Sequence, residues 1–429
     1  MTTAHPSRPI VVFANFLSDL AVDLDEGQIL MEWAQQAPRK AWLLRPGDVL
    51  VSPVPLGPEF LRYVCDLTRT TPETVTVVTV PPAGAVPLAR AVEEAGLGEH
   101  VRTLAGDRGA ALLPTALDAS VIAFARRTGL AVHPYPTVEA AEDALKMTML
   151  LNTKAGFRET VEPLGMRLPA GRLCRRPATE GVVRELLGEY GSVVVKPDRS
   201  AGGHGMRFIS RDDVRGGVFP ALDAIGGPEG IWVVEECLDV AESVSIQLEV
   251  TPSGTHALFS GAMRTAHGSF TGYASPLPPS CAHVADELEE WGKALGRHLA
   301  AHGYAGPFGL DGLVDAHGVL YANESNIRRT ATTTPHAMVT RLTTDSANPH
   351  PAWSVGKGWA QRSLGFEEAL ARLQASRLAF DPERGEGVVL YADAPLDGRS
   401  WRYAVVGTTT EDVEAREAAL ADVLAFERR

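Results

Sequence analysis

The chain has 429 residues, of which 45% are hydrophobic and 22% are charged, a composition typical of a globular protein. Its 53 acidic residues outnumber its 40 basic ones, and the net charge of −13 excludes a general nucleic-acid binder. No apolar run is long enough to span a membrane, and the first residues lack the pattern of a secretory signal. The four cysteines have no C-x-x-C spacing, so we expect reduced thiols in a cytoplasmic protein.

The chain divides into three predicted domains, residues 1–135, 136–344 and 345–429. In the first domain, short apolar runs alternate with a predicted helix over 87–97, which indicates an α/β domain with a mainly parallel sheet. The runs that we interpret as strands are residues 10–16, 48–53, 75–80 and 120–125.

The second and third domains mix strands and helices. One long helix is predicted from residue 138 to Gly165, which is a natural helix stop. Strands are predicted at 192–197, 205–210, 230–238, 243–250 and 256–263, then a helix at 285–303 and a hairpin of 306–315 with 318–325. The third domain has predicted helices at 366–376 and 411–426 and predicted strands at 387–393 and 401–407.

A lysine at a strand end is followed by a glycine-rich loop. Lys196 closes the apolar run of 192–197, and the loop that begins at Ser200 contains Gly202, Gly203 and Gly205. An ammonium group beside unhindered backbone N–H groups suits a polyphosphate. The common phosphate loop, G-x-x-x-x-G-K-[ST], does not occur in the chain. Taken alone, the loop is equally consistent with a simple hairpin connection.

A predicted hairpin carries oxygen ligands on one face. Asp311 lies on its first strand, and Glu324 and Asn326 lie on its second strand. Because side chains alternate along strands, we expect these three to lie side by side. Mg²⁺ prefers such hard oxygen ligands together with substrate phosphates. The alternatives are a turn aspartate before Gly312 and a solvated strand glutamate.

The order of these elements resembles the ATP-grasp superfamily over roughly residues 140–335, with spacings similar to those of D-alanine ligases and biotin carboxylases. The resemblance implies that ATP and Mg²⁺ are bound. It assigns the phosphates to Lys154, Lys196 and the loop with Ser200, Gly202, Gly203 and Gly205. It assigns the adenine edge to Glu235 and the backbone of Glu236 and Leu238, the ribose to Glu242, and Mg²⁺ to Asp311, Glu324 and Asn326.

The superfamily transfers the γ-phosphate of ATP to a carboxylate, and an amine or thiol then attacks the acyl phosphate. A cation should face the acyl-phosphate oxygens, and the candidates are Arg328, Arg329 and Arg264, each of which could instead be a salt-bridge partner. D-Alanine ligases carry an arginine two residues before the first metal carboxylate. This chain has Gly309 there, which argues against a D-alanyl dipeptide product.

The whole chain is similar to ATP-grasp peptide ligases of the type found in pheganomycin biosynthesis. That similarity implies a pre-ATP-grasp α/β domain, an ATP-grasp fold of two α+β subdomains and a small C-terminal α+β segment. It also implies a nonproteinogenic amino-acid donor, which could bear a guanidino group, and a peptide acceptor. A homodimer stays open, as do three other functions: an L-amino acid ligase, a non-catalytic ATP-binding module and the carboxylation of a biotin carrier.

Overall fold

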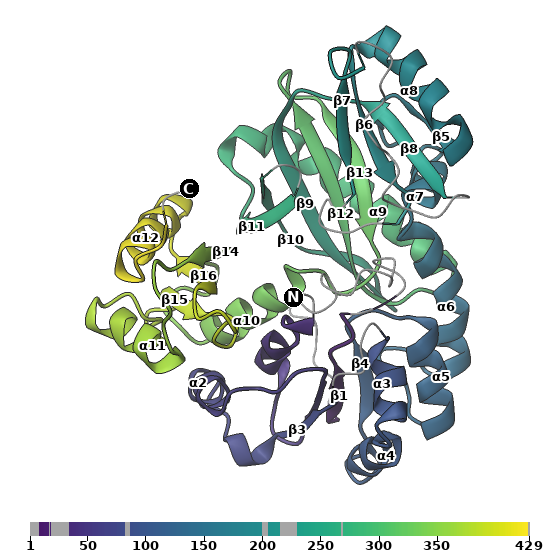
Figure 1. Cartoon of the computed structure of the whole chain (residues 1–429). Helices are drawn as coiled ribbons and strands as arrows, with labels where there is room; N and C mark the ends of the chain where they lie inside the picture. Colours follow the sequence, from purple (N-terminus) through teal and green to yellow (C-terminus); the bar gives the residue numbers. More distant parts are fainter. Residues whose placement is uncertain are drawn as a thin grey trace.

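The computed structural model describes residues 8–16, 18, 34–81, 86–199, 205–214, 230–266 and 269–427, and three sheets organise this part of the chain (Figure 1). One sheet belongs to the N-terminal region, a small one follows it, and a large one contains the remaining strands. No helix in the described ranges combines the length and the apolar composition needed to cross a bilayer.

The N-terminal sheet is parallel, with strand order β3-β2-β1-β4. Its two central strands are fully buried, as their apolar composition predicts for a parallel sheet covered on both faces. Its strands are β1 (Ile10–Phe13), β2 (Val49–Ser52), β3 (Thr76–Thr79) and β4 (Ala111–Pro114). Its helices are η1 (Ala37–Leu43), α2 (Pro58–Leu67), η2 (Pro72–Thr74), α3 (Leu88–Glu94), α4 (Gly98–Gly106) and α5 (Ala119–Thr128).

The strand predicted at 120–125 is wrong, because these residues lie in α5. Asp118 caps this helix by accepting a hydrogen bond from the backbone N–H of Val121, and Gly129 ends it in the left-handed conformation. The buried positions 121, 122, 124 and 125 form one helical face, so the apolar run has the helical period. The fourth strand is instead β4.

The helix predicted from residue 138 to Gly165 is two helices, α6 (Val138–Leu151) and α7 (Lys154–Val161). Thr153 accepts a hydrogen bond from the backbone N–H of Gly156 and thereby caps α7. Lys154 is therefore the first residue of a new helix.

The small sheet is antiparallel, with order β5-β8-β6-β7, and α8 (Arg176–Tyr190) packs on it. Its core contains Val183, Val195 and Trp232. Its strands are β5 (Gly171–Arg175), β6 (Ser192–Pro197), β7 (Arg207–Ser210) and β8 (Ile231–Glu236).

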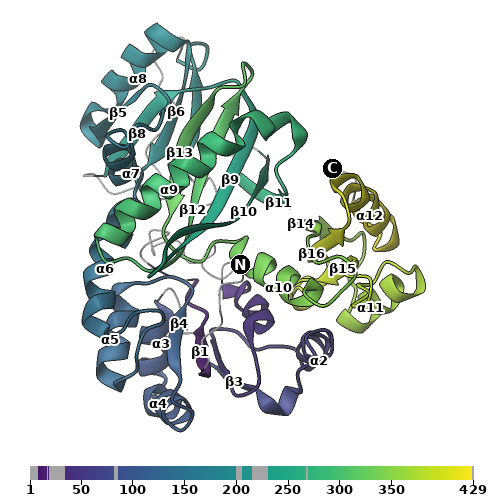
Figure 2. The same cartoon turned by 180° about the vertical axis from the view of Figure 1, so that it is seen from behind.

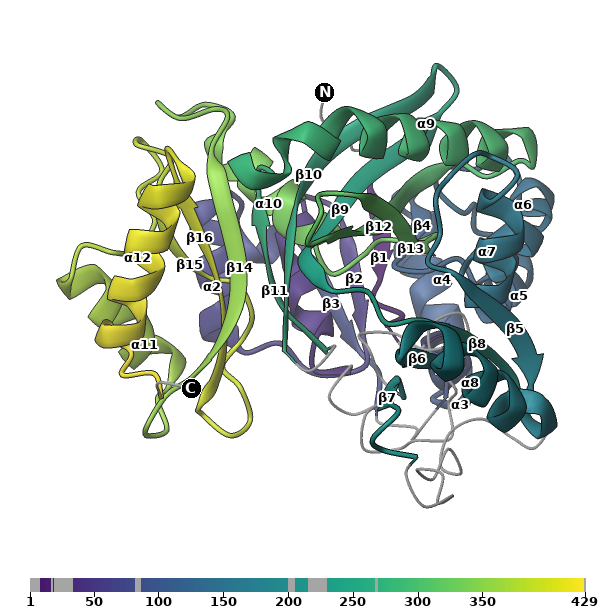
Figure 3. The same ribbon diagram turned by 90° about the horizontal axis from the view of Figure 1, so that it is seen from above.

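The large sheet is antiparallel, with order β13-β12-β9-β10-β11-β14-β16-β15. Its strands are β9 (Val240–Thr251), β10 (Gly254–Ala266), β11 (Ser269–Ser275), β12 (Gly306–Asp315), β13 (Leu320–Asn326), β14 (Ala352–Trp359), β15 (Gly387–Leu390) and β16 (Ser400–Gly407). Its helices are η3 (Pro279–Val284), α9 (Ala285–Ala301), α10 (Thr333–Thr343), α11 (Phe366–Ala375) and α12 (Thr410–Val423). Figure 2 shows α9 crossing the face of β9 and β10, and Figure 3 shows β14 continuing the sheet toward the C-terminal strands.

Two cores hold the N-terminal sheet between the other parts of the molecule. On one face, residues such as Phe13 share a core with Phe157 and with Leu248 beneath α9. On the other face, residues such as Trp42 share a core with the C-terminal strands, including Val405. The N-terminal region thus meets both ends of the large sheet, which brings residues distant in sequence around one cavity.

Candidate active site

A cavity of about 810 Å³ is lined by the small and large sheets and by N-terminal residues that follow β1 and β4 or lie in η1, and this volume is in the range of small-molecule sites. We distinguish two parts of it by their charged side chains. The carboxylate part is lined by Lys154, Lys196, Glu235, Glu236, Asp311, Asn323, Glu324, Asn326 and Arg328. The cationic part is lined by Asn15, Arg39, Thr115, Arg329, Lys357, Tyr391 and Arg402.

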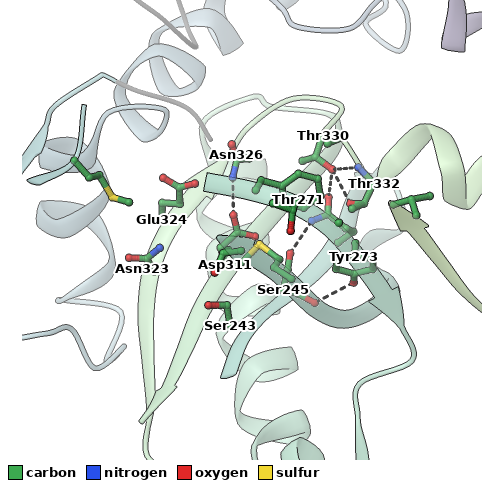
Figure 4. A pocket seen from close by; sticks show the side chains of 18 of the residues that line it. Ser243, Ser245, Thr271, Tyr273, Asp311, Asn323, Glu324, Asn326, Thr330 and Thr332 are labelled. Carbon is green, nitrogen blue, oxygen red and sulfur yellow. Dashed lines mark hydrogen bonds between the residues drawn. The ribbon is translucent and has the colours of Figure 1, made fainter. Parts of the chain in front are cut away.

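The predicted hairpin is present, and its register pairs Asp311 of β12 directly with Glu324 of β13. Asn326 pairs with Gly309, and its Nδ2 donates a hydrogen bond to Oδ2 of Asp311 at 2.9 Å (Figure 4). The tight turn before β13 contains Gly318 at a φ of +79°, a conformation that favours glycine. Two carboxylates and an amide from distant positions therefore converge.

A β-bulge adds a further polar side chain to this face. The register shifts between Asp311 and Gly312, so that Asn323 is an extra residue on β13. Both Asn323 and Glu324 consequently line the cavity, although strict alternation would turn one of them away (Figure 4). The bulge explains why the hairpin supplies more polar groups than its sequence pattern indicates.

The two carboxylates repel each other in a buried setting. Burial and the neighbouring Glu324 raise the pKa of Asp311 to about 7, against the opposing effects of Ser245, Arg328 and Asn326. A hard divalent cation would remove this repulsion. The described ranges contain no group of three or more His, Cys, Asp or Glu that could hold a metal. The oxygen donors at this position are two carboxylates, Asp311 and Glu324, and the amide of Asn326. That set fits Mg²⁺, which commonly completes its shell with phosphate oxygens and water.

Lys196 is held in place by a buried ion-pair cluster. Its Nζ lies 2.5 Å from Oε2 of Glu235, and Nη1 of Arg158 lies 2.5 Å from Oε1 of the same carboxylate. Burial would raise the pKa of Glu235, but the attraction of Lys196 and Arg158 keeps it below its ordinary value. Lys196 also donates to Oδ1 of Asn323 at 3.0 Å. The Glu235 carboxylate thus positions Lys196, and Glu235 also lines the cavity, where its expected contact with an adenine edge stays a prediction.

Glu236 and Leu238 line the cavity, as expected for neighbours of a nucleotide base. The backbone N–H of Glu236 is already donated to the carbonyl of Ala170 at 2.8 Å, and its carboxylate accepts the Ala170 N–H at 2.8 Å. The N–H of Glu236 is therefore not available to a ligand.

The structure places Glu242, the residue expected to bind the ribose, outside the lining of the cavity. On β9, Ser243 and Ser245 face the cavity, whereas Val244 and Ile246 belong to the core beneath α9. Glu242 has the parity of the second pair and thus points to the opposite face of the sheet. The sequence alone does not show which face of β9 meets a helix.

Lys154 reaches the same cavity from the start of α7. Its Nζ lies 3.6 Å from Oε2 of Glu324, and burial is the main reason that its pKa is lowered. Its backbone N–H donates to the carbonyl of Asp198 at 3.0 Å, and the N–H of Ala155 donates to Oδ1 of Asp198 at 2.8 Å. These bonds tie α7 to the end of β6, and so both lysines lie beside the carboxylate pair.

The three candidate arginines have different positions. Arg328 lines the carboxylate part and donates from Nη1 to Oδ1 of Asn152 at 2.5 Å. Arg329 lines the cationic part, and its backbone N–H donates to the carbonyl of Thr115 at 3.0 Å. Arg264 does not line the cavity, because its Nη1 pairs with Oε1 of Glu417 at 2.7 Å. The structure thus favours the alternative named for Arg264, a salt-bridge partner, here on α12.

The glycine loop is described only in part. Ser200, Gly202 and Gly203 lie outside the described residues. Gly205 has a φ of +78°, which glycine adopts without strain, and the following Met206 lines the cavity.

Several lining or supporting residues were missed by the sequence analysis. Arg158 lies about one helical turn after Lys154 on α7 and pairs with Glu235. Asn152 accepts a hydrogen bond from Arg328. Apart from Arg329, the cations of the cationic part come from η1, β14 and β16, and no local motif marks them. The one available signal was Asn323, which directly precedes Glu324 in the hairpin.

Comparisons with known proteins agree with this architecture. A family model described as the pre-ATP-grasp domain matches residues 37–130, and one described as the PGM1 C-terminal domain matches residues 368–420. No curated protein matches the chain.

Solved structures match the fold over nearly its whole length. N5-carboxyaminoimidazole synthase from Aspergillus clavatus, in complex with ADP and an aminoimidazole ribonucleotide, is 13% identical with a TM-score of 0.55 and coverage of 98% of this chain and 99% of that one. Biotin carboxylase from Campylobacter jejuni, in a β-γ-ATP complex, is 14% identical with a TM-score of 0.59 and coverage of 98% and 92%. The biotin carboxylase domain of the Hydrogenobacter thermophilus 2-oxoglutarate carboxylase, with MgADP and bicarbonate, is 14% identical with a TM-score of 0.57 and coverage of 99% and 91%.

At these identities the likeness concerns the fold, and it agrees with the family model and with the strand order of the three sheets. The chain therefore folds as a pre-ATP-grasp α/β domain, an ATP-grasp region of two antiparallel sheets with their helices, and a C-terminal segment whose strands extend the second of these sheets.

Proposed function

We propose that this protein is an ATP-dependent, ADP-forming ligase that joins a carboxylic acid to an amine. The observation that carries the proposal is the convergence of Lys154, Lys196, Arg328 and the Asp311–Glu324–Asn326 set on one cavity. The fold supports it, since solved structures of the same fold hold ADP, a β-γ-ATP ligand or MgADP.

The chemistry follows from the charges in the carboxylate part. An oxygen of the substrate carboxylate would attack the γ-phosphorus of ATP, and ADP would leave with the electrons of the broken P–O bond. The amine nitrogen would then attack the acyl carbon, phosphate would leave, and the nitrogen would lose a proton to solvent. A carboxylate is a poor electrophile, so the phosphate supplies the leaving group that amide formation needs.

The residues of the chain would act mainly by positioning and by charge stabilisation. Lys154 and Lys196 would offset the charge of the ATP phosphates, and the Glu235–Arg158 pair keeps Lys196 in place. Arg328 would donate to the acyl-phosphate oxygens, with Asn152 fixing its guanidinium. Asp311, Glu324 and Asn326 would hold Mg²⁺, which when bound neutralises phosphate charge.

For the substrates we propose a nonproteinogenic amino acid as the acid and a peptide as the amine, as in the biosynthesis of a peptide natural product such as an antibiotic. The cavity supports this because it continues beyond the carboxylate pair into the cationic part, which leaves room beside a nucleotide. The four free thiols are compatible with a cytoplasmic enzyme.

Mass spectrometry of the products tests the proposal. The protein is incubated with ATP, Mg²⁺, a pool of amino and carboxylic acids and a pool of short peptides. A product should weigh the sum of two components less one water and appear together with ADP. Lys196→Met should abolish it, whereas Lys293→Met, which changes a half-buried lysine on α9 outside the cavity lining, should not. No condensation mass, or ADP release that depends only on bicarbonate, would contradict the ligase assignment.

A further inference from the structure

Two consecutive cations, Arg39 and Lys40, are buried in the N-terminal region. Arg39 lines the cationic part of the cavity, whereas Lys40 is not among its lining residues. Arg39 and Lys40 lie on η1 and are only 5% and 1% exposed. A buried cation is costly unless a counter-charge or a full set of hydrogen bonds compensates for it. The partners of these two side chains therefore matter.

Among the described residues, Arg39 and Lys40 contact neutral groups. Arg39 donates to the carbonyl and the side chain of Gln36, and its guanidinium lies 5.2 Å from the ring centre of Tyr391. Lys40 donates to Oγ1 of Thr334 at 2.9 Å and lies 5.0 Å from the ring centre of Phe16. Among the described residues, no carboxylate lies within ion-pair distance of either side chain.

Arg329 adds a third positive charge to the pair. Burial and the charges of Arg329 and Arg39 hold the pKa of Lys40 well below its ordinary value. Burial lowers the pKa of Arg329, and the negative charge of Glu249 opposes part of this effect without forming an ion pair with Arg329. The three cations therefore repel one another in a largely buried setting.

Arg39 and Arg329 are among the residues that line the cavity of the proposed reaction centre, and Arg329 also lines a smaller pocket together with Glu249. The cationic part of the cavity is also lined by the side chains of Asn15 and Thr115, and by Lys357 and Arg402 from the paired strands β14 and β16. Shared neighbours group these cations, because Tyr391 interacts with both Arg39 and Arg402, and Lys40 with both Arg39 and Arg329. The acidic residues that line the cavity, Glu235, Glu236, Asp311 and Glu324, lie on β8, β12 and β13.

We propose that Arg39 and Arg329, with Lys40 behind them, form a binding site for an anionic group of a substrate that is not consumed in the reaction. The chemical class is a carboxylate, which two arginines can bind through paired hydrogen bonds. It has two sources: the C-terminal carboxylate of the amine acceptor, or a second carboxylate on the acid donor. The assignment of this carboxylate to a substrate rests on the proposed ligase function, whereas anion binding at the site does not.

The proposal bears on one expectation. The resemblance to peptide ligases left open a guanidino-bearing donor, and a cationic donor would favour an acidic surface. The described lining beyond Arg328 is cationic instead. A substrate that carries a positive group there would face Arg39, Arg329, Lys357 and Arg402.

A binding measurement without turnover tests the site separately from the ligase activity. Isothermal titration compares succinate with its neutral diamide, succinamide, for the full chain without ATP. We expect succinate to bind at least roughly tenfold more tightly, and Arg39→Met and Arg329→Met each to weaken it by roughly 10–100-fold. Arg39→Lys, which keeps the charge, should retain much of the affinity. Arg62→Met, at an arginine 60% exposed in its side chain, is the matched control.

Each outcome decides the proposal. Equal succinate affinity in wild type, Arg39→Met and Arg329→Met overturns it, since an anion bound at Lys154 and Lys196 would give that result. Circular dichroism checks that the variants fold, and Arg329→Met keeps the test valid if Arg39→Met does not fold. This binding result stands whether or not any condensation product is found.

Turnover assays then distinguish the two sources. If the acceptor supplies the carboxylate, amidation of its C-terminus should raise KM by roughly 10–100-fold in wild type and have little effect in Arg39→Met. If the donor supplies it, the same pattern should appear when a dicarboxylic acid is replaced by its monoacid analogue. Substrates that react equally well with and without the second carboxylate would overturn the assignment to a substrate.

Discussion

The two parts of the cavity differ in how their charges are compensated. In the carboxylate part, Lys196 is paired with Glu235 and Lys154 lies 3.6 Å from Glu324. In the cationic part, Arg39 and Lys40 contact neutral groups. The first part is thus largely assembled by the protein itself, whereas the second holds positive charge that a ligand could compensate. This difference implies that removing a charge destabilises the first part and can relieve repulsion in the second.

The largest effect is expected at the centre of the compensated part. Glu235→Gln should lower the free energy of unfolding by about 3–5 kcal/mol, because it leaves Lys196 and Arg158 buried without a counter-charge. Urea denaturation at neutral pH measures this change.

A matched control separates the stability lost because the ion pair is buried from the stability lost by removing any ion pair. Glu185→Gln removes a partner of Arg172 at 2.8 Å, but both side chains are more than half exposed. It should cost less than about 1 kcal/mol. Similar losses in the two variants would show that the Glu235 cluster is not a special support of the site.

The same difference explains how much of the site could be predicted from the sequence. Asp311, Glu324 and Asn326 lie on one hairpin, so strand alternation and a short turn suffice to bring them together. Arg39, Arg329 and Arg402 come from three distant segments, and only the packing of the N-terminal sheet on the C-terminal strands unites them. Tertiary contacts of this kind leave no local pattern.

The fold shows a similar boundary between what was predicted and what was not. The apolar runs of β1, β2, β6 and β12 predicted strands correctly, because each is short and buried. The run at 120–125 is equally apolar but has the helical period and an Asp118 cap, and it forms α5. For Glu242, the sequence predicted the alternation of side chains along β9, but it did not show which face of β9 is covered by α9.

Substitution of Arg328 at the reaction centre should lower the reaction rate more than it lowers the stability of the fold. Arg328→Ala should lower kcat by roughly 10²–10³-fold, since it removes a donor that would stabilise charge at the acyl phosphate. Steady-state ADP release at saturating substrate concentrations measures it. Wild-type turnover in this variant would exclude Arg328 from the mechanism.

A smaller effect is expected from protonation beside the cationic part. His336 lies on α10, the helix whose Thr334 accepts the hydrogen bond from Lys40, and its ring stacks on Phe259. Burial lowers the pKa of His336 to about 4, so the unfolded chain binds a proton more readily than the folded protein does. Stability should therefore be lost as the pH falls from about 6.5 toward 4.

A non-titrating variant isolates this contribution of His336. Between pH 7 and pH 5, the unfolding free energy of wild type relative to His336→Gln should fall by on the order of 2 kcal/mol. Chemical denaturation at several pH values measures the difference. Parallel pH profiles for the two proteins would mean that the histidine titrates normally.

The smallest effect is expected where sequence and structure disagree. The sequence made Arg264 a candidate for acyl-phosphate stabilisation, but its guanidinium pairs with Glu417 on α12, and the residue is absent from the cavity lining. Because the Arg264 side chain is 39% exposed, solvent screens the pair, and Arg264→Met should cost less than about 1 kcal/mol of stability. The variant should also change kcat by less than about twofold, in contrast to the 10²–10³-fold loss for a charge-stabilising donor. Steady-state kinetics of Arg264→Met beside Arg328→Ala decides between the two arginines, since a large loss in the first would place β10 within reach of the reacting phosphate.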